Sequence, residues 1–337
     1  MLTALRRTQY LVYYVMQLDW KAFMTYTAYA SRMTGRSRMG LVLDAVASVY
    51  RYNTGLMDYF LFRFFEKEPV ARASWVGTGL KYEFDRQMNP ATARPILEDK
   101  LRFYQAYAPF IHHPHCSRDE LIRGEGKADA VWRNPSGKIV IKRATGQCGW
   151  DVEVVRTAEW TPTSLVAHMR ARGFDLAEAF VQQHPALDAL SPAGLNTVRV
   201  VTVIDATGRV DHLAARLRLT VNSPVDNLAS GNIACPVDLR TGVVCGPGVY
   251  SDITRPAVYH HPVTNVPLIG FSVPFWAEIL AATQAIARHR PENRGVGWDV
   301  AVTERGPDFI EGNHNWCKIL WQVPVDRGLK HELERYR

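Results

Sequence analysis

The chain has 337 residues, of which 47% are hydrophobic, and its 40 Lys and Arg exceed its 33 Asp and Glu by a formal net charge of +7. This length and composition indicate a globular protein with a substantial core, in one large domain or two to three smaller ones. The mild basic excess suits anionic ligands, but the sequence has no zinc-finger or RNA-binding motif, so we expect no nucleic-acid partner.

The cysteines and the start of the chain bear on the compartment. The five cysteines are scattered, odd in number and never spaced as CxxC, which argues for a reducing environment. We find no signal-peptide pattern at the start and no apolar run of ~20 residues. We therefore expect a cytoplasmic protein, with peripheral membrane association as the alternative.

Residues 1–67 show helical periodicity, for example in Leu11, Val12, Val15 and Leu18. This segment carries nine Lys and Arg against four Asp and Glu, so it holds most of the net positive charge. One interpretation is a small helical subdomain packed on the rest of the chain. The other is a basic, aromatic surface that lies on a membrane or contacts a membrane-bound partner.

Residues 70–94, which include Gly77, Gly79, Asn89 and Pro90, are predicted to be a connector. Pro95 and the acidic residues after it are typical of a helix start, and this helix is expected to run to about Ala108.

From about residue 127 short β segments are predicted, which makes the chain an α+β protein. We expect a hairpin of 130–133 and 138–142, a strand at 151–156, and a helix at 162–172. A strand should end at 180–185, and a second hairpin should pair 196–204 with 210–221. Loop-rich strands fill 225–270, a helix covers 273–289, and a final hairpin spans 297–313.

The final hairpin carries a candidate metal site. If it folds about Arg305, Asp299 lies opposite Glu311, and Glu311 and Asn313 share one face of their strand. Two carboxylates and an amide oxygen suit a hard divalent cation such as Mg²⁺. The alternative is an ordinary solvated hairpin.

Three further groups suggest phosphate binding. Lys142 ends an apolar strand just before a loop with Gly146 and Gly149, where backbone N–H groups can approach phosphate oxygens. Arginines on two strands that we expect to pair could line an anion-binding groove; they are Arg199, Arg216 and Arg218. Asn227 lies in a polar, Gly-containing loop. Each group read alone also fits solvated surface residues.

Together, the order of these features resembles the ATP-grasp superfamily, and the motif sequences are most similar to those of its sugar-transfer-associated branch. The stretches that carry the resemblance are Gln183–Pro185, Leu195–Arg199, Val225–Asn227 with Gly231, His261–Pro262, Gly297–Asp299 and Ile310–Asn313.

The resemblance implies an ATP-grasp fold, two α+β subdomains that clasp ATP, preceded here by a helical N-terminal region. On this basis we expect a helical region and connector at 1–94, an ATP-grasp domain at 95–325 and a C-terminal tail at 326–337. The ATP-grasp domain would divide into a central lid subdomain at about 127–185 and a metal-binding subdomain at 186–325.

The resemblance also implies roles for individual residues. Lys100 and Lys142 would contact the phosphates of ATP, and the loop of Gly146 and Gly149 would close over them. The adenine hinge would lie at Gln182, Gln183 and His184, and Asn227 would contribute a loop contact. One or two Mg²⁺ ions would bind to Asp299, Glu311 and Asn313. The transferred phosphoryl group would be stabilised by Arg199, Arg216 and Arg218.

The activity that the resemblance implies is an ATP-dependent carboxylate–amine ligase, which forms an amide through an acyl phosphate. Its substrates would be ATP, a small-molecule carboxylate and an amine, with a sugar acid, an amino acid or a glycan precursor as the acceptor. Two alternatives are a kinase that phosphorylates a hydroxyl and a non-catalytic nucleotide-binding adaptor of a glycan-assembly system. The sequence does not indicate the oligomeric state.

Overall fold

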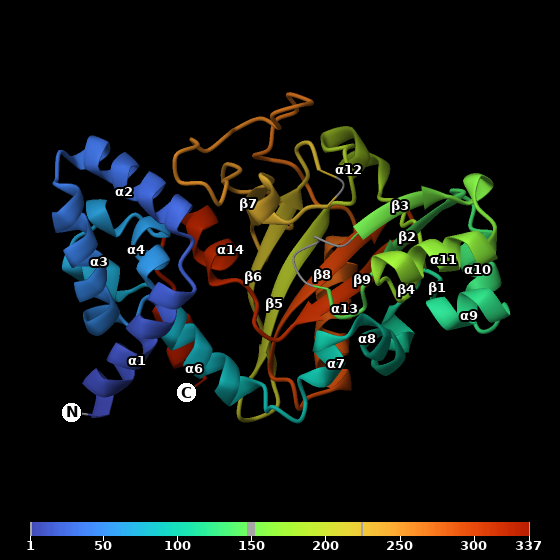
Figure 1. Ribbon diagram of the computed structural model, residues 1–337, viewed down its shortest axis with the longest axis horizontal. Helices are drawn as coiled ribbons and strands as arrows, with labels where there is room; N and C mark the ends of the chain where they lie inside the picture. The colour runs from blue at the N-terminus through green and yellow to red at the C-terminus, as the bar shows by residue number, and fades with distance from the viewer. Residues whose placement is uncertain (1, 147–151, 224, 337) are drawn as a thin grey trace.

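The computed structural model describes residues 2–146, 152–223 and 225–336. Three parts lie next to one another: a bundle of helices, a five-stranded sheet in the centre, and a four-stranded sheet with its own helices (Figure 1). The α+β class and the helical region at the start of the chain are both as the sequence predicts.

The helical region begins with three 15-residue helices and continues with shorter ones. Local signals set the boundaries: the Asp19 carboxylate caps α2 by accepting from the Ala22 N–H, and Gly35 ends α2 in the left-handed conformation. The elements are α1 (Leu2–Met16), α2 (Trp20–Thr34), α3 (Arg38–Tyr52), α4 (Leu56–Leu61), η1 (Phe64–Glu66), α5 (Pro69–Ala73) and α6 (Thr78–Met88).

The helical region is anchored to the rest of the chain by buried polar contacts. Gln322 donates to the Val76 carbonyl at 3.1 Å and accepts from the Val76 N–H at 2.9 Å. Lys318 forms an ion pair of 2.9 Å with the buried Asp58. These contacts agree with the interpretation of a helical subdomain packed on the rest.

The middle of the chain forms the four-stranded antiparallel sheet, in the order β1-β4-β2-β3. Helices flank it, and the next segment leads back to the central sheet. The elements are α7 (Pro95–Glu98), α8 (Lys100–Ala106), η2 (Ala108–Phe110), β1 (His115–Ser117), α9 (Arg118–Arg123), α10 (Ala128–Trp132), β2 (Lys138–Lys142), β3 (Val152–Arg156), η3 (Thr157–Glu159), α11 (Pro162–Arg172), β4 (Leu176–Ala179) and α12 (Pro185–Leu190).

The five-stranded antiparallel sheet has the order β7-β6-β5-β8-β9, and its main apolar core includes Val198, Leu217 and Val300. The predicted hairpins β5–β6 and β8–β9 are both confirmed. The elements are β5 (Thr197–Ile204), β6 (Val210–Leu219), η4 (Leu228–Ser230), β7 (Ile233–Val237), α13 (Trp276–His289), β8 (Gly295–Thr303), β9 (Gly306–Asn313), α14 (Lys318–Gln322), η5 (Val323–Val325) and α15 (Lys330–Glu334).

Three local predictions were wrong. The connector at 70–94 contains α6, whose residues Phe84 and Met88 are fully buried, so packing outweighs the turn-forming residues Gly77 and Pro90 at its ends. Residues 130–133 lie in and just after helix α10, and β2 pairs with β3 and β4 instead. The helix from Pro95 is interrupted at Asp99, which caps α8 by accepting from the Arg102 N–H.

Candidate functional site

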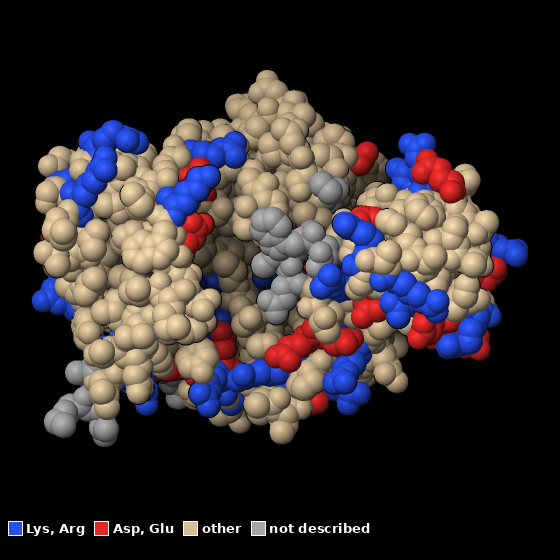
Figure 2. All heavy atoms as spheres, in the orientation of Figure 1, with Lys and Arg blue, Asp and Glu red and all other residues tan. Residues whose placement is uncertain are grey.

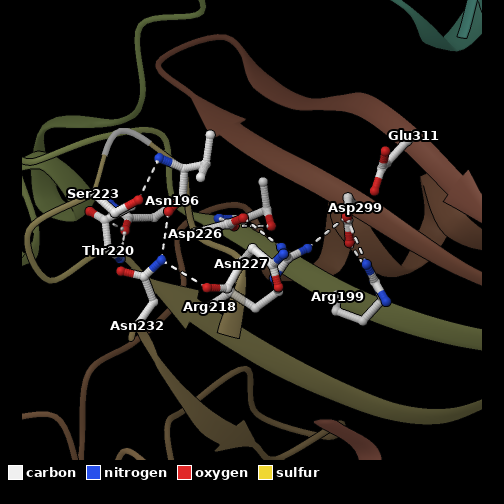
Figure 3. Close-up of polar contacts among 12 residues, drawn as sticks. Asn196, Arg199, Arg218, Thr220, Ser223, Asp226, Asn227, Asn232, Asp299 and Glu311 are labelled. Atoms are coloured by element: carbon white, nitrogen blue, oxygen red, sulfur yellow. Dashed lines mark hydrogen bonds and ion pairs between the residues drawn. The ribbon is translucent and has the colours of Figure 1, made fainter. Parts of the chain in front are cut away.

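Strand pairing brings three charged side chains into one row across the central sheet. Arg199 on β5 lies opposite Asp299 on β8, and Asp299 lies opposite Glu311 on β9. Directly opposite residues in a sheet project to the same face. The predicted pairing of Asp299 with Glu311 is therefore confirmed, and the Glu311 carboxylate points toward Asp299 (Figure 3).

Asp299 is the centre of a buried ion-pair network. Arg199 contacts both carboxylate oxygens of Asp299, with Nη2 at 2.8 Å from Oδ2, and Arg218 Nη1 lies 2.6 Å from the same oxygen. Burial alone would raise the pKa of Asp299, but the two guanidinium groups outweigh it and hold this pKa below its usual value. Asp299 is therefore ionised, and its contacts hold both arginines in place.

A second carboxylate completes this network. Asp226 Oδ1 lies 2.7 Å from Arg218 Nη2, and its other oxygen accepts from the Thr197 N–H at 2.9 Å. Burial lowers the pKa of Arg218, but Asp226 and Asp299 together raise it above its usual value, so Arg218 stays charged. Sequence reasoning did not single out Asp226, although an Asp next to Asn227 in a polar loop was a usable signal.

Glu311 and Asn313 lie at the open side of this row. The Glu311 side chain is 30% exposed, Asn313 Nδ2 donates to its Oε1 at 3.2 Å, and Lys100 Nζ lies 3.4 Å from its Oε2. Lys100 also donates to the Gly146 carbonyl at 2.7 Å. Lys100, in the first turn of α8, therefore contacts both the loop after β2 and the acidic end of β9.

The donors present fit Mg²⁺. Glu311 and Asn313 offer oxygen atoms toward the cavity, and the ionised Asp299 lies next to Glu311. Within the described residues, no three His, Cys, Asp or Glu side chains group as a metal site. A Mg²⁺ ion held by these donors would take its remaining ligands from water and from phosphate oxygens, as this ion commonly does.

The four-stranded sheet contributes a buried ion pair to the same cavity. Lys142 Nζ lies 2.7 Å from Glu178 Oε2, and both side chains are buried. Burial raises the pKa of Glu178, but Lys142 outweighs this effect and lowers it. Tyr104 donates to the other Glu178 oxygen. Sequence reasoning missed Glu178, although a lone acidic residue in the apolar strand Leu176–Ala179 was a signal.

These groups line one cavity of about 530 Å³, within the size range of small-molecule sites. A hollow is visible in the middle of the molecular surface (Figure 2). Leu61 of α4 and Ile319 of α14 also line the cavity, so the helical region contributes to it. The predicted site residues that line it are Lys100, Lys142, Gly146, Arg199, Arg218, Asn227, Asp299, Glu311 and Asn313.

Arg216 is not brought to this cavity. Its Nη2 donates to the Trp321 carbonyl at the end of α14, and its Nη1 donates to the Ala215 carbonyl at 2.8 Å. Burial lowers the pKa of Arg216 to about 10. Its contacts are those of a structural residue, because α14 covers that part of the sheet face, and the expected role beside Arg199 and Arg218 is corrected here.

The three residues of the predicted adenine hinge do not line the cavity. Phe180 and Val181 line the cavity, but Gln182, Gln183 and His184 do not. Gln183 instead accepts from the Asn196 N–H at 3.0 Å, and His184 caps α12 by accepting from the Ala186 N–H. The predicted loop residue Gly149 lies outside the described residues.

Residues 80–337 match the family described as sugar-transfer associated ATP-grasp. Among curated proteins no sequence matches the chain.

Solved structures resemble the chain at low identity. Biotin carboxylase from Campylobacter jejuni is 12% identical over 72% of this chain and 46% of its own, with a TM-score of 0.46. An L-amino acid ligase from Bacillus licheniformis is 12% identical over 72% of this chain and 51% of its own, with a TM-score of 0.38. A RimK domain ATP-grasp protein from Sphaerobacter thermophilus is 13% identical over 73% of this chain and 69% of its own, with a TM-score of 0.39.

The match spans only about half the length of the first of these structures. The family match, in contrast, covers most of this chain. It includes the row of Arg199, Asp299 and Glu311 and the two lysines that line the cavity, Lys100 and Lys142. The chain belongs to the sugar-transfer associated ATP-grasp family.

Proposed function

We propose that this protein is an ATP-dependent carboxylate–amine ligase that forms an amide through an acyl phosphate. The observation that carries the proposal is the composition of the cavity. Two lysines, Lys100 and Lys142, line it together with Arg199, Arg218 and the Glu311 end of β9. In the proposed reaction a carboxylate must approach the triphosphate of ATP, and the two anions repel each other. The Lys and Arg side chains, with a metal ion at the acidic end of β9, would offset this repulsion.

In this proposal the lysines bind the phosphates of ATP. Lys142 is the better placed, since its ion pair with Glu178 fixes the ammonium at the cavity wall without leaving it isolated in the core. The adenine would lie against the apolar side chains of β2 and β3, near Val140 and Val154, with the Phe180–Val181 backbone at its edge. This replaces the contacts expected from Gln182, Gln183 and His184.

Glu311 and Asn313, with Asp299 beside them, would hold Mg²⁺, which supplies positive charge to the phosphate oxygens. Arg199 and Arg218 are oriented by Asp299, so they can stabilise developing charge with little reorganisation. The acceptor carboxylate would attack the γ-phosphorus with release of ADP. An amine would then attack the acyl carbon, an amide would form, and inorganic phosphate would leave.

The acceptor would enter on the side lined by Leu61 and Ile319. We propose a sugar acid, an amino acid or a glycan precursor as its class, in keeping with the description of the family.

The test is a screen of carboxylates in which ADP release is measured with and without an amine, and hydroxylamine traps any acyl phosphate as a hydroxamate. The proposal expects hydroxamate and an amine-dependent release of inorganic phosphate. A phosphorylated hydroxyl product without free phosphate would mean the kinase. Binding of Mg-ATP without ADP release across the screen would favour the adaptor.

A further inference from the structure

Exposed apolar side chains are concentrated in the first three helices. Of the eighteen large hydrophobic side chains that are exposed among the described residues, eleven lie between residues 5 and 50. Isolated exposed hydrophobics are normal on protein surfaces, but a concentration of this kind marks an interaction site. The eleven are Leu5, Val12, Tyr13, Val15, Met16, Trp20, Met24, Met33, Met39, Leu43 and Tyr50.

Helical spacing arranges many of these side chains in stripes. On α3, Met39, Leu43 and Tyr50 recur at intervals of four and seven residues, opposite the buried side chains of Leu41 and Ala45. On α2, Trp20 and Met24 are one turn apart, and Trp20 is 56% exposed. The α3 stripe points away from the core that α3 buries, whereas Trp20 and Met24 lie at the edge of the buried side of α2, where the Trp20 ring contacts Phe23 at a centroid distance of 6.1 Å.

The three helices form one layer. Helix α3 packs against α1, α2 and α4, and it lies between α1 and α2 at the edge of the molecule (Figure 1). Thr8 of α1 is 3.2 Å from the Tyr50 hydroxyl of α3, which ties the two helices together along this layer. We call the exposed side of α1, α2 and α3 the outer helical face.

The outer helical face is positively charged. Among the described residues from 5 to 52, the exposed charged side chains are one carboxylate, Asp19, and five basic groups. The five are Arg6, Lys21, Arg32, Arg38 and Arg51. This lobe shows Lys and Arg over a mostly uncharged surface (Figure 2). Aromatic, Met and Leu side chains ringed by Lys and Arg are the composition of amphipathic helices that lie in a bilayer interface.

The charge also decides between occupants of this face. A second copy of the chain would place one basic face against another, which like-charge repulsion opposes. An anionic bilayer attracts the Lys and Arg and accepts the apolar side chains at its headgroup boundary. Within the described residues, no helix is long and apolar enough to cross a membrane. Association with lipid through this face would therefore be peripheral.

We propose that the outer helical face of α1, α2 and α3 binds the surface of an anionic lipid bilayer, with Trp20 and Met24 inserted among the headgroups. The proposal does not depend on the ligase activity.

Flotation of the full chain with lipid vesicles tests it. Vesicles of phosphatidylcholine alone are compared with vesicles of equal parts phosphatidylcholine and phosphatidylglycerol. We expect binding only to the anionic vesicles, and loss of most binding between about 0.1 M and about 1 M salt, as the Debye length shortens from ~10 Å to ~3 Å.

Two variants address the two contributions. Trp20→Ser with Met24→Ser removes apolar contacts, and Lys21→Glu with Arg32→Glu reverses charge. Each should weaken binding to anionic vesicles about tenfold or more. Tyr259→Ser with Val263→Ser is the matched control, because both side chains are exposed hydrophobics outside the helical region and should leave binding unchanged. Thermal unfolding establishes that each variant is folded.

Three results would overturn the proposal. These are no binding to anionic vesicles, binding that neither variant weakens, and a concentration-dependent dimer in light scattering that Trp20→Ser with Met24→Ser abolishes. The last result would assign the outer helical face to a second copy of the chain.

Discussion

Asp299 on β8 and Arg199 on β5 are directly paired across the central sheet, and the guanidinium contacts both oxygens of the carboxylate. Arg218 reaches the same carboxylate from β6 at 2.6 Å. A single carboxylate therefore fixes two cations at the wall of the cavity. This relationship means that Asp299 has a structural role besides any contact with a metal ion.

The first prediction follows from this double role. Asp299→Asn leaves two buried guanidinium groups with reduced compensation, so the free energy of unfolding should fall by about 3–5 kcal/mol. Urea denaturation measures this loss. Glu311→Gln, at a side chain that is 30% exposed, should change stability by less than about 1 kcal/mol. An Asp299→Asn protein as stable as the wild type would contradict the structural role.

The second prediction concerns the Lys142–Glu178 pair. Lys142→Met leaves a buried carboxylate without its cation and should cost about 3–5 kcal/mol. The double variant Lys142→Met with Glu178→Gln removes both charges, keeps a polar group near Tyr104, and should recover most of that stability. Nucleotide binding, followed by calorimetry, should stay weak in both. If the double variant bound Mg-ATP like the wild type, Lys142 would not be a phosphate ligand.

The third prediction concerns pH. Burial lowers the pKa of His115, His212 and His261 below the usual 6.5. The unfolded chain therefore takes up protons near pH 6.5, where the folded protein does not, so stability is present above pH 6.5 and is lost as the pH falls below it. Denaturation between pH 7.5 and about pH 5 measures this slope.

A pair of neighbouring histidines provides the control for the pH effect. His261 is buried, and its Nε2 donates to the Thr220 carbonyl at 2.7 Å, whereas His260 is exposed. His261→Gln should flatten the slope of stability against pH, and His260→Gln should not. Equal slopes in both variants would show that burial of His261 does not contribute.

The fourth prediction tests the proposal that adenine contacts the Phe180–Val181 backbone and not Gln183. Gln183 accepts from both the backbone and the side chain of Asn196, at 3.0 and 2.8 Å, and so links the segment after β4 to the start of β5. Gln183→Ala should lower the free energy of unfolding by about 1–3 kcal/mol, since Asn196 loses an acceptor. The affinity for Mg-ATP should be unchanged within about twofold. A loss of affinity without a loss of stability would restore Gln183 to the nucleotide site.

The sequence predicted those parts of the site that depend on strand period and on local turns. The pairing of Asp299 with Glu311 was predicted, although the turn alone would place Asp299 opposite Ile310, and a β-bulge between Asp299 and Val300 brings it opposite Glu311. The β5–β6 hairpin follows from its Thr207–Gly208 turn. Side-chain period also placed Arg216 and Arg218 on one face of their strand, and their pairing with Arg199 and Thr197 confirms this. It could not show that α14 covers this face at Arg216, because that contact joins residues 105 positions apart.

Long-range packing explains the other misses. Helix α6 is stabilised because Phe84 and Met88 are buried against residues of the central sheet and the C-terminal segment. Glu178 is paired because β4 lies beside β2, an order that the chain sequence does not fix. The proposed domain boundaries at residues 94, 185 and 325 remain predictions.

The central claim is that the cavity between the two sheets binds Mg-ATP through Glu311, and thermal unfolding with nucleotide tests it most directly. A ligand at ~100 times its dissociation constant adds about 2.7 kcal/mol to stability, which is a shift of several degrees. We predict a shift with Mg-ATP that disappears with EDTA, shrinks in Glu311→Gln and persists in Glu304→Gln, an exposed acidic residue in the turn of the same hairpin. A full magnesium-dependent shift in Glu311→Gln, or no shift in the wild type, would contradict the account.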